Sequence, residues 1–274
     1  MPELPEVETI RRDLETLLVG KKIAGVEIYY SGSVKIPSAA RLRQELPGRK
    51  ITGVGRRGKY LQIFLHDASV LIIHLRMTGQ LLFAKNVFQP DKHTHVIFIF
   101  SDSSSLAFHD VRKFGTIYWL PSHSLQLIKG LASLGPEPFA AEFNESYLFE
   151  RAKNRKTSIK ALLLNQEIVA GLGNIYADES LHRAGIRPDR PAASLTLNEC
   201  KILCQSICEV LEEAIYWRGT TMSDYRDAAG SSGAFQNHLR VYKQSGKECP
   251  RCGQEICRIV VAGRGTHYCP ACQK

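Results

Sequence analysis

Four cysteines near the end of the chain restrict its fold more strongly than any other feature. Cys249 and Cys252, followed by Cys269 and Cys272, form the pattern C-x2-C-x16-C-x2-C. Each C-x2-C pair has the spacing of a knuckle that directs two sulfur atoms at one tetrahedral ion, and the segment IVVAGRGTHY between the pairs can form a hairpin. We therefore predict one zinc ion held by four thiolates. Because the protein would supply all four ligands, this zinc is structural rather than catalytic.

The other four cysteines lack knuckle spacing. Cys200, Cys204 and Cys208 recur every fourth residue in a helical pattern, beside leucine and isoleucine side chains. A metal-binding stripe would have this spacing, but free thiols that act as small buried apolar side chains fit the flanking residues better. Cys257 is isolated. Disulfides are not expected, because the absence of a signal sequence and of any membrane-length apolar run indicates a soluble intracellular protein.

The chain changes periodicity near its middle. Before that point, β-branched and aromatic runs separated by Gly, Asp and Ser are typical of consecutive antiparallel strands. These runs occupy residues 59–65, 70–77, 95–100 and 115–120. An amphipathic helix of roughly residues 5–20 precedes them. Beyond residue 143 the spacing is helical instead. The helical segments cover residues 158–169, 171–185 and 199–217.

This pattern predicts an α+β fold of two domains. We expect an N-terminal antiparallel β-sandwich flanked by helices, and a C-terminal helical module that carries a β-hairpin zinc finger. The expected boundaries are residues 1–133 for the sandwich, 134–235 for the helical domain and 236–274 for the finger. Residues 218–235 are rich in Gly, Ser and Ala, which indicates a mobile loop.

The charge distribution indicates a polyanionic partner. The formal net charge is +9, and residues 235–274 contribute +5 of it, from seven Lys or Arg against two Glu. A chain this basic commonly binds nucleic acid. DNA is the first expectation, and RNA is a weaker alternative because the aromatic motif of RNA-recognition domains is absent.

The first residues, MPELPEVETIRR, contain a feature that the predicted helix does not require. Pro5 suits a first helical turn, but Pro2 and Glu3 precede it. Removal of Met1 would leave Pro2 with a free secondary amine whose pKa is about 8, against about 10.4 for lysine. Such an amine can attack a carbon electrophile and form an iminium, and Glu3 beside it could move protons.

Six motifs place this N-terminus in a recognisable context. They are PELPEVE at the start, RRGKYL at 56–61, HLRMTG at 74–79, DVRKFG at 110–115, GLGNIYADE at 171–179 and GRGTHYCPACQ at 263–273. In this order and over the whole chain, the sequence resembles the formamidopyrimidine-DNA glycosylase family. The resemblance implies a bifunctional enzyme of bacterial base-excision repair. Such an enzyme excises 8-oxoguanine and formamidopyrimidines, then nicks the abasic site by β,δ-elimination.

The resemblance also implies catalytic roles. Pro2 is the nucleophile that forms the Schiff base at C1′ of the deoxyribose, and Glu3 is its acid/base partner. Lys59 serves β-elimination and the phosphates near the lesion, although a lysine in a solvated basic patch is the alternative. Arg264 binds phosphate and assists δ-elimination, with a solvated hairpin-tip arginine as its alternative.

Further residues match the family's DNA contacts. Met77, Arg112 and Phe114 correspond to the wedge that fills the gap left by an extruded nucleotide, where a ring and a thioether can replace lost stacking. Taken alone, Met77 and Phe114 would each be assigned to the sheet core, and only the motif context favours the wedge. The phosphate contacts implied by motif position are His74, His93, Arg155 and Asn174, with the adjacent Lys156 as an alternative to Arg155. The loop of residues 218–235 would cover the flipped base, through Thr220, Thr221 or Tyr225.

The resemblance implies double-stranded DNA with an oxidised purine opposite cytosine as the substrate, no membrane partner, a monomer, and a cytoplasmic, nucleoid-associated location in a bacterium. Two alternatives stay open. The first is the endonuclease VIII type of glycosylase, which prefers oxidised pyrimidines. The second is a zinc-finger DNA-binding protein without catalysis, which would have no use for a free Pro2 amine.

Overall fold

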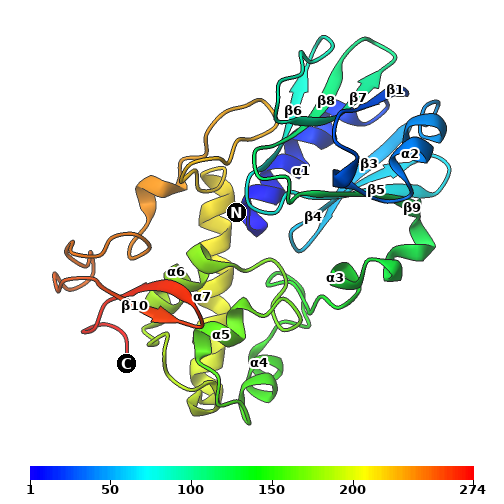
Figure 1. The fold of residues 1–274 in the computed structure, drawn as a ribbon. Helices are drawn as coiled ribbons and strands as arrows, with labels where there is room; N and C mark the ends of the chain where they lie inside the picture. Colours follow the sequence, from blue (N-terminus) through cyan, green and yellow to red (C-terminus); the bar gives the residue numbers. More distant parts are fainter. The chain divides into compact units, whose positions relative to one another are not determined.

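The computed structural model describes all 274 residues, which divide into two compact units (Figure 1). Unit 1 comprises Met1–Ala132 together with Trp217–Ala234. Unit 2 comprises Ser133–Tyr216 and Phe235–Lys274. Unit 1 is therefore discontinuous, because it contains the segment that sequence composition assigned to a loop of the helical domain.

Unit 1 is a sandwich of two sheets. The first sheet has the strand order β1-β7-β8-β6 and the second β2-β9-β5-β4-β3. The strands are β1 (Ile23–Ile28), β2 (Val34–Ile36), β3 (Ile51–Arg57), β4 (Tyr60–Leu65), β5 (Ser69–His74), β6 (Gly79–Ala84), β7 (Thr94–Phe100), β8 (Ser105–Asp110) and β9 (Thr116–Pro121). Every pairing is antiparallel except β2 with β9. The predicted β-sandwich is confirmed, with one parallel edge pairing added.

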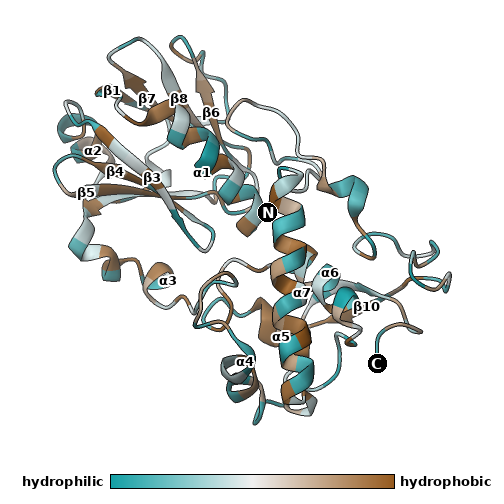
Figure 2. Ribbon diagram, turned by 180° about the vertical axis from the view of Figure 1, so that it is seen from behind, coloured by the Kyte–Doolittle hydropathy of each residue, from teal (hydrophilic) through white to brown (hydrophobic).

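Apolar side chains from both sheets form a single core in unit 1. Its deepest members include Leu61, Ile73, Val96 and Phe108, each at most 1% exposed. The hydrophobic colouring of Figure 2 accordingly follows these strands. Strands β4 and β5 pair along their length, from Tyr60 opposite His74 to Phe64 opposite Val70. This register brings the start of β4, next to Lys59, beside the end of β5, which is His74.

Helix α1 (Leu4–Leu18) contributes one face to the same core. Val7, Ile10, Leu14 and Leu18 recur at helical spacing and are at most 1% exposed. The helix begins with a proline in its first turn and an acidic residue near its positive dipole end, both of which favour that terminus. Shorter helices α2 (Ala39–Glu45) and α3 (Lys129–Ala132) complete this unit.

Hydrogen bonds hold the 217–234 segment on unit 1. Arg218 contacts Asp13 of α1 and Asp227, at 2.7 Å each, and Phe83 N donates to the Ala228 carbonyl at 2.9 Å. Tyr225 is 7% exposed and lies within the sandwich core. Composition favoured a mobile loop, whereas these contacts give the segment a defined path.

Unit 2 is built around α7 (Leu197–Tyr216), the long yellow helix of Figure 1, against which α4 and α6 pack. The other helices are α4 (Glu145–Ala152), α5 (Ile159–Leu164) and α6 (Asn174–Ala184). Strands β10 (Cys257–Val261) and β11 (Arg264–Tyr268) form the predicted hairpin. The helical module and hairpin finger expected from the sequence are both present.

The cysteines of α7 belong to its buried face. Cys200 and Cys204 are 0% and 8% exposed, and Cys208 is half-buried. Burial raises the pKa of Cys200 to about 11 and that of Cys204 to about 12, so both remain protonated thiols. Their prediction as apolar packing residues is confirmed. None of the helices combines the length and the hydropathy needed to cross a bilayer.

Candidate active site and metal centre

The start of the chain is tied into the first turn of α1. Pro2 is buried, Glu3 is 3% exposed, and Met1 is 52% exposed. Glu3 is the N-cap and forms a reciprocal capping box with Glu6, whose Oε2 accepts a hydrogen bond from Glu3 N at 2.7 Å. Glu6 Oε1 accepts another from Thr220 N at 2.7 Å. The backbone beside Pro2 is thus held in place before any substrate binds.

Lys59 lies in the tight turn between β3 and β4 and is only 6% exposed. Gly58 precedes it with a φ of 57°, the left-handed region that favours glycine. The Arg56 guanidinium donates to the Gly58 carbonyl at 3.0 Å and to Glu8 Oε2 of α1 at 3.1 Å. Burial of Glu8 disfavours its charge, but hydrogen bonds from three arginines outweigh this and hold the pKa of Glu8 below its ordinary value. A lysine this buried is not part of a solvated surface patch.

His74 ends β5 close to this turn. It lies opposite Tyr60 in the strand register, with the two rings edge to face and 4.5 Å between their centroids. Burial lowers the pKa of His74 to about 3, and the positive charges of Arg76 and Lys59 act in the same direction. Its Nδ1 accepts a hydrogen bond from Arg76 N at 3.0 Å. At neutral pH the ring is uncharged, and Nε2 carries the proton that it can donate.

Two turns bring the predicted wedge residues together. Met77 follows β5, whereas Arg112 and Phe114 follow β8. Arg112 Nη1 lies 3.2 Å from Met77 Sδ, and its guanidinium stacks 4.7 Å from the centroid of the Phe114 ring. Met77 is 41% exposed and Phe114 is 50% exposed, which excludes the sheet-core alternative for both. Three side chains from two separate motifs, HLRMTG and DVRKFG, therefore form one exposed cluster.

Asp110 joins these two turns from beneath. It is fully buried, and its Oδ1 accepts hydrogen bonds from Thr78 Oγ1 and from Arg112 N, the latter at 3.2 Å. Its Oδ2 accepts a third from Gly115 N at 2.8 Å. Gly115 is required by space, because a Cβ there would lie 2.3 Å from the Phe108 ring. The carboxylate of Asp110 thus fixes both turns through charge-assisted hydrogen bonds.

The remaining predicted DNA contacts are distributed over both units. His93 precedes β7 and its ring lies edge to face with that of His109, 5.6 Å between centroids. Arg155 is exposed between α4 and α5. Arg264 is exposed at the first position of β11, which leaves its alternative as a solvated hairpin arginine open.

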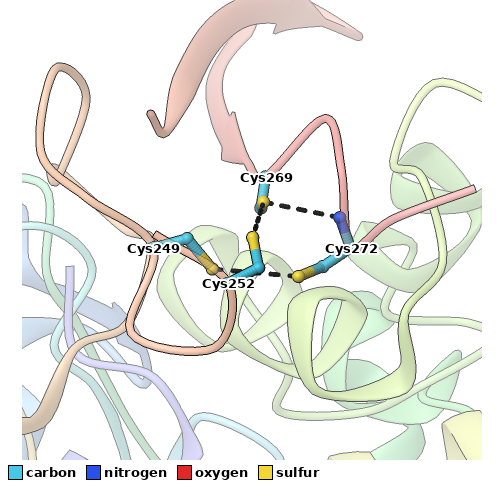
Figure 3. Close-up of side chains that lie close together, drawn as sticks. All are labelled: Cys249, Cys252, Cys269 and Cys272. Atoms are coloured by element: carbon cyan, nitrogen blue, oxygen red, sulfur yellow. Dashed lines mark hydrogen bonds between the residues drawn. The ribbon is translucent and has the colours of Figure 1, made fainter. Parts of the chain in front are cut away.

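The four knuckle cysteines converge on one point (Figure 3). Their sulfur atoms all lie within 4.8 Å of one another, with 3.9 Å between Cys249 and Cys272 and 3.5 Å between Cys252 and Cys269. A tetrahedral zinc with bonds of about 2.3 Å requires sulfur–sulfur separations of roughly 3.8 Å. The spacing and the donor set therefore both fit zinc, and four protein ligands make the site structural.

One face of α6 holds the C-terminal hairpin and knuckle. Residues at every fourth position of a helix share a face, and three such residues contact this module. The contacts are Asn174 Nδ2 to the Gly265 carbonyl at 3.1 Å, Asp178 Oδ2 to His267 N at 2.9 Å, and His182 Nε2 to Cys249 Sγ at 3.4 Å. The Asn174 side-chain amide is thus partly engaged by Gly265, the residue that follows Arg264.

A buried ion pair reinforces the same junction. Lys160 of α5 and Asp178 of α6 are both 0% exposed, with 2.6 Å between Nζ and Oδ1. Lys160 Nζ also donates to Thr266 Oγ1 at 2.8 Å and to the Gly265 carbonyl at 3.3 Å. Two helices and β11 therefore meet at one charged cluster inside unit 2.

Sequence patterns did not identify several of these residues. Asp110, Lys160 and Asp178 gain their partners only through folding, and Glu179 binds the backbone N–H groups of residues 240–242. The available signal for Asp178 and Glu179 was a pair of adjacent acidic residues within a segment of helical spacing. Both residues lie in the motif GLGNIYADE, in which Asn174 is the predicted DNA contact.

Comparison with known protein families covers most of the chain. The Formamidopyrimidine-DNA glycosylase N-terminal domain matches residues 1–117, and the Formamidopyrimidine-DNA glycosylase H2TH domain matches residues 134–226. The Zinc finger found in FPG and IleRS matches residues 246–274. Among curated proteins, the Formamidopyrimidine-DNA glycosylase of Geobacillus kaustophilus is 48% identical and that of Pelotomaculum thermopropionicum is 46% identical. Both alignments cover 100% of this chain. They cover 100% of the Geobacillus protein and 99% of the Pelotomaculum protein.

Solved structures from Lactococcus lactis are also similar, at 42% identity and a TM-score of 0.92. One is a complex of Fpg with DNA that contains an abasic site, and covers 99% of both chains. Two others are complexes of wild-type Fpg (MutM) and cover all of both chains. One holds DNA with N7-benzyl-Fapy-dG and the other holds DNA with an oxidised pyrimidine.

Proposed function

The chain belongs to the formamidopyrimidine-DNA glycosylase family, and from that membership we propose that Pro2 is the nucleophile with which it excises damaged bases. The protein is a bifunctional DNA glycosylase and AP lyase that acts on oxidised purines. One observation carries the assignment of Pro2. The family match begins at residue 1, and Pro2 is buried directly before Glu3, the residue that caps α1 through its capping box with Glu6. The capping accounts for Glu3 but leaves buried Pro2 without a role in the helix.

The first step follows from the chemistry of a secondary amine. Removal of Met1 frees the Pro2 nitrogen, which attacks C1′ of the damaged nucleotide with its lone pair. The C1′–N bond breaks, its electron pair leaves with the base, and a proton compensates the departing nitrogen. Glu3 is adjacent in the chain and is the proposed proton carrier. Ring opening of the sugar then yields an iminium between Pro2 and C1′.

The iminium makes the second activity possible. Its positive nitrogen withdraws electrons and acidifies the proton on C2′, so that removal of this proton expels the 3′ phosphate by β-elimination. A second elimination expels the 5′ phosphate, and hydrolysis of the Schiff base then frees Pro2. Lys59 is proposed to serve β-elimination and the nearby phosphates, a role supported by its burial in the β3–β4 turn. Arg264 is proposed for phosphate binding and δ-elimination.

Two solved structures of the related Lactococcus lactis Fpg hold DNA that contains an abasic site or N7-benzyl-Fapy-dG, and we propose damaged double-stranded DNA as the partner of this chain. We propose that Met77 and Phe114 fill the gap left by the extruded nucleotide, and that Arg112 hydrogen-bonds the orphaned base. Cytosine opposite the lesion would present acceptors to the guanidinium. The exposed cluster of the three side chains supports this role. Neutral His74 would contact phosphate as a hydrogen-bond donor, and His93, Arg155 and Asn174 are further proposed phosphate contacts.

We also propose an oligomeric state, a cellular location and a division into functional domains. One chain carries a complete set of candidate catalytic residues, which supports action as a monomer. A cytoplasmic, nucleoid-associated location follows from the DNA substrate. We retain residues 1–133, 134–235 and 236–274 as the functional division into catalytic, helical and finger domains, with residues 218–235 near the flipped base.

Borohydride trapping tests the nucleophile directly. The protein is incubated with a duplex containing 8-oxoguanine opposite cytosine, the Schiff base is reduced, and the adduct is mapped by peptide mass spectrometry. We expect the adduct on Pro2, and none at Pro2 in protein that retains Met1, because the Pro2 nitrogen is then a tertiary amide without nucleophilic character. An adduct on Lys59, or none from protein shown to lack Met1, would overturn the proposal.

Lys59→Ala separates chemistry from binding. We expect it to slow strand cleavage more than it weakens duplex affinity, and equal losses would reduce Lys59 to a phosphate contact.

A panel of damaged duplexes addresses the oxidised-pyrimidine alternative, because one related enzyme is bound to DNA with an oxidised pyrimidine. Faster excision of oxidised pyrimidines than of 8-oxoguanine would favour the endonuclease VIII type.

A further inference from the structure

We propose that His182 is a positioning residue of the zinc centre, donating its Nε2–H to the thiolate of Cys249. The residue lies on the last turn of α6 and is 2% exposed. Its Nε2 is 3.4 Å from Cys249 Sγ, within range of an N–H···S hydrogen bond. No role in catalysis or DNA binding is assigned to it, and its contact is with a sulfur rather than with the metal position.

The tautomer of the ring follows from its surroundings. His182 Nδ1 is buried and has no hydrogen-bond partner. If Nδ1 carried the proton, a buried N–H would have no acceptor while the Nε2 lone pair faced a negatively charged sulfur. With the proton on Nε2, the donor meets the thiolate, and only an acceptor is left unpaired, which is the less costly arrangement. The zinc-loaded site therefore selects the Nε2–H form.

The hydrogen bond has an electrostatic purpose. Four thiolates around one Zn²⁺ carry a formal excess of two negative charges. Cys249 is 2% exposed, so little solvent is available to stabilise that charge at its sulfur. An N–H donor from α6 supplies this stabilisation and lowers the tendency of the thiolate to be protonated and lost from the metal.

Neighbouring contacts hold the donor in line. Arg251, between the first two cysteine ligands, donates to the carbonyls of His182 at 3.4 Å and Arg183 at 3.1 Å. These carbonyls lie in the last turn of α6, where backbone donors become scarce. The His182 carbonyl also accepts from Gly185 N at 3.1 Å. The knuckle thus caps the helix through Arg251 while the helix supports the knuckle through His182.

Two substitutions distinguish hydrogen bonding from packing. His182→Phe keeps a buried ring but removes the donor, whereas His182→Gln places an amide N–H near the position of Nε2. Alanine is unsuitable, because a hollow of about 460 Å³ borders His182 and would admit water to the sulfur. His95→Phe, at a histidine of unit 1 that is 1% exposed, controls for loss of a buried imidazole far from the knuckle in sequence.

Zinc affinity of the full-length protein is measured by equilibrium competition with a chromogenic chelator. We expect His182→Phe to weaken zinc binding roughly 10-fold or more, and His182→Gln and His95→Phe to stay within about 3-fold of the parent. Wild-type affinity in His182→Phe would overturn the proposal. Equal weakening in His182→Phe and His182→Gln would overturn it also, since packing alone would then explain the loss.

A spectroscopic signature tests the bond itself. In protein loaded with ¹¹³Cd in place of zinc, a scalar correlation across the N–H···S contact should link the metal to the His182 ring proton and disappear in His182→Phe. A cadmium-loaded protein with an intact four-sulfur shift and no such correlation would refute the hydrogen bond.

Discussion

The buried ion pair between Lys160 and Asp178 permits a quantitative prediction for unit 2. Lys160→Met removes the ammonium group but leaves the Asp178 carboxylate 0% exposed, with His267 N as its remaining strong donor. Breaking a buried pair from one side costs about 3–5 kcal/mol, because the orphaned charge stays desolvated. Methionine has a similar length, so a cavity contributes little to the change.

Native-state hydrogen exchange is the assay, because it reports the stability of each segment separately. A loss of about 3 kcal/mol corresponds to exchange that is roughly 100-fold faster or more. We expect this acceleration in peptides covering α5, α6 and β11, and unchanged exchange in peptides of β4 and β5. Lys160→Met combined with Asp178→Asn removes both charges and should recover much of the protection.

An exchange rate in α6 that changes less than about 3-fold in Lys160→Met would show that the orphaned Asp178 charge costs little. A double variant as destabilised as the sum of the two single variants would also contradict the prediction, since the two charges would then act independently. A uniform acceleration across both units would point to global destabilisation instead of opening at the α5–α6–β11 junction.

Three further predictions concern other parts of the molecule. Chelation of zinc should abolish duplex binding while the circular dichroism of the sandwich persists, and binding that survives complete metal loss would contradict a role for the finger. Asp110→Asn removes one charge-assisted acceptor beneath the turns that carry Met77 and Arg112, so thermal unfolding should show a loss of about 1.5–3 kcal/mol and lesion affinity should fall. An unchanged melting curve and affinity would show that the Asp110 carboxylate does not hold these turns. His74 has a pKa of about 3 in the folded protein against about 6.5 unfolded, so the unfolded chain binds more protons between those values. The contribution of His74 to the unfolding free energy is therefore complete above pH 6.5 and should fall by about 3 kcal/mol from pH 7 to pH 4. NMR should show no titration of the His74 ring above pH 4. A midpoint near pH 6 for His74 would be incompatible with that burial.

Local patterns predicted the parts of this fold that local chemistry determines. Alternation of apolar residues identified the strands, and knuckle spacing identified Cys249, Cys252, Cys269 and Cys272, because a C-x2-C turn is built from four consecutive residues. Hydropathy could not place Met77, since an exposed wedge and a core position use the same apolar side chain. Resemblance to a family supplied what periodicity lacked.

Local sequence patterns did not predict contacts between segments that are far apart in the chain. Thr78 and Asp110 are 32 positions apart, and nothing in either motif shows that they share a hydrogen bond. In the sequence, Lys160 looks like a solvent-facing lysine of a helix. Only the folded chain shows that its ammonium group pairs with Asp178 and Thr266. Likewise, the Gly- and Ser-rich composition around Tyr225 gave no sign that its ring would fill the sandwich core.

The discontinuity of unit 1 has a consequence for biosynthesis. The 84 residues of Ser133–Tyr216 must be synthesised before the segment containing Thr220 and Tyr225 can join the sandwich. At roughly 5–20 residues per second, translation spends about 4–17 s on this interval. During that time the core lacks Tyr225, and Glu6 lacks its bond from Thr220 N. The helix start beside Pro2 is therefore completed late in synthesis, when all seven α-helices have already left the ribosome's catalytic centre and only the hairpin finger remains to be made.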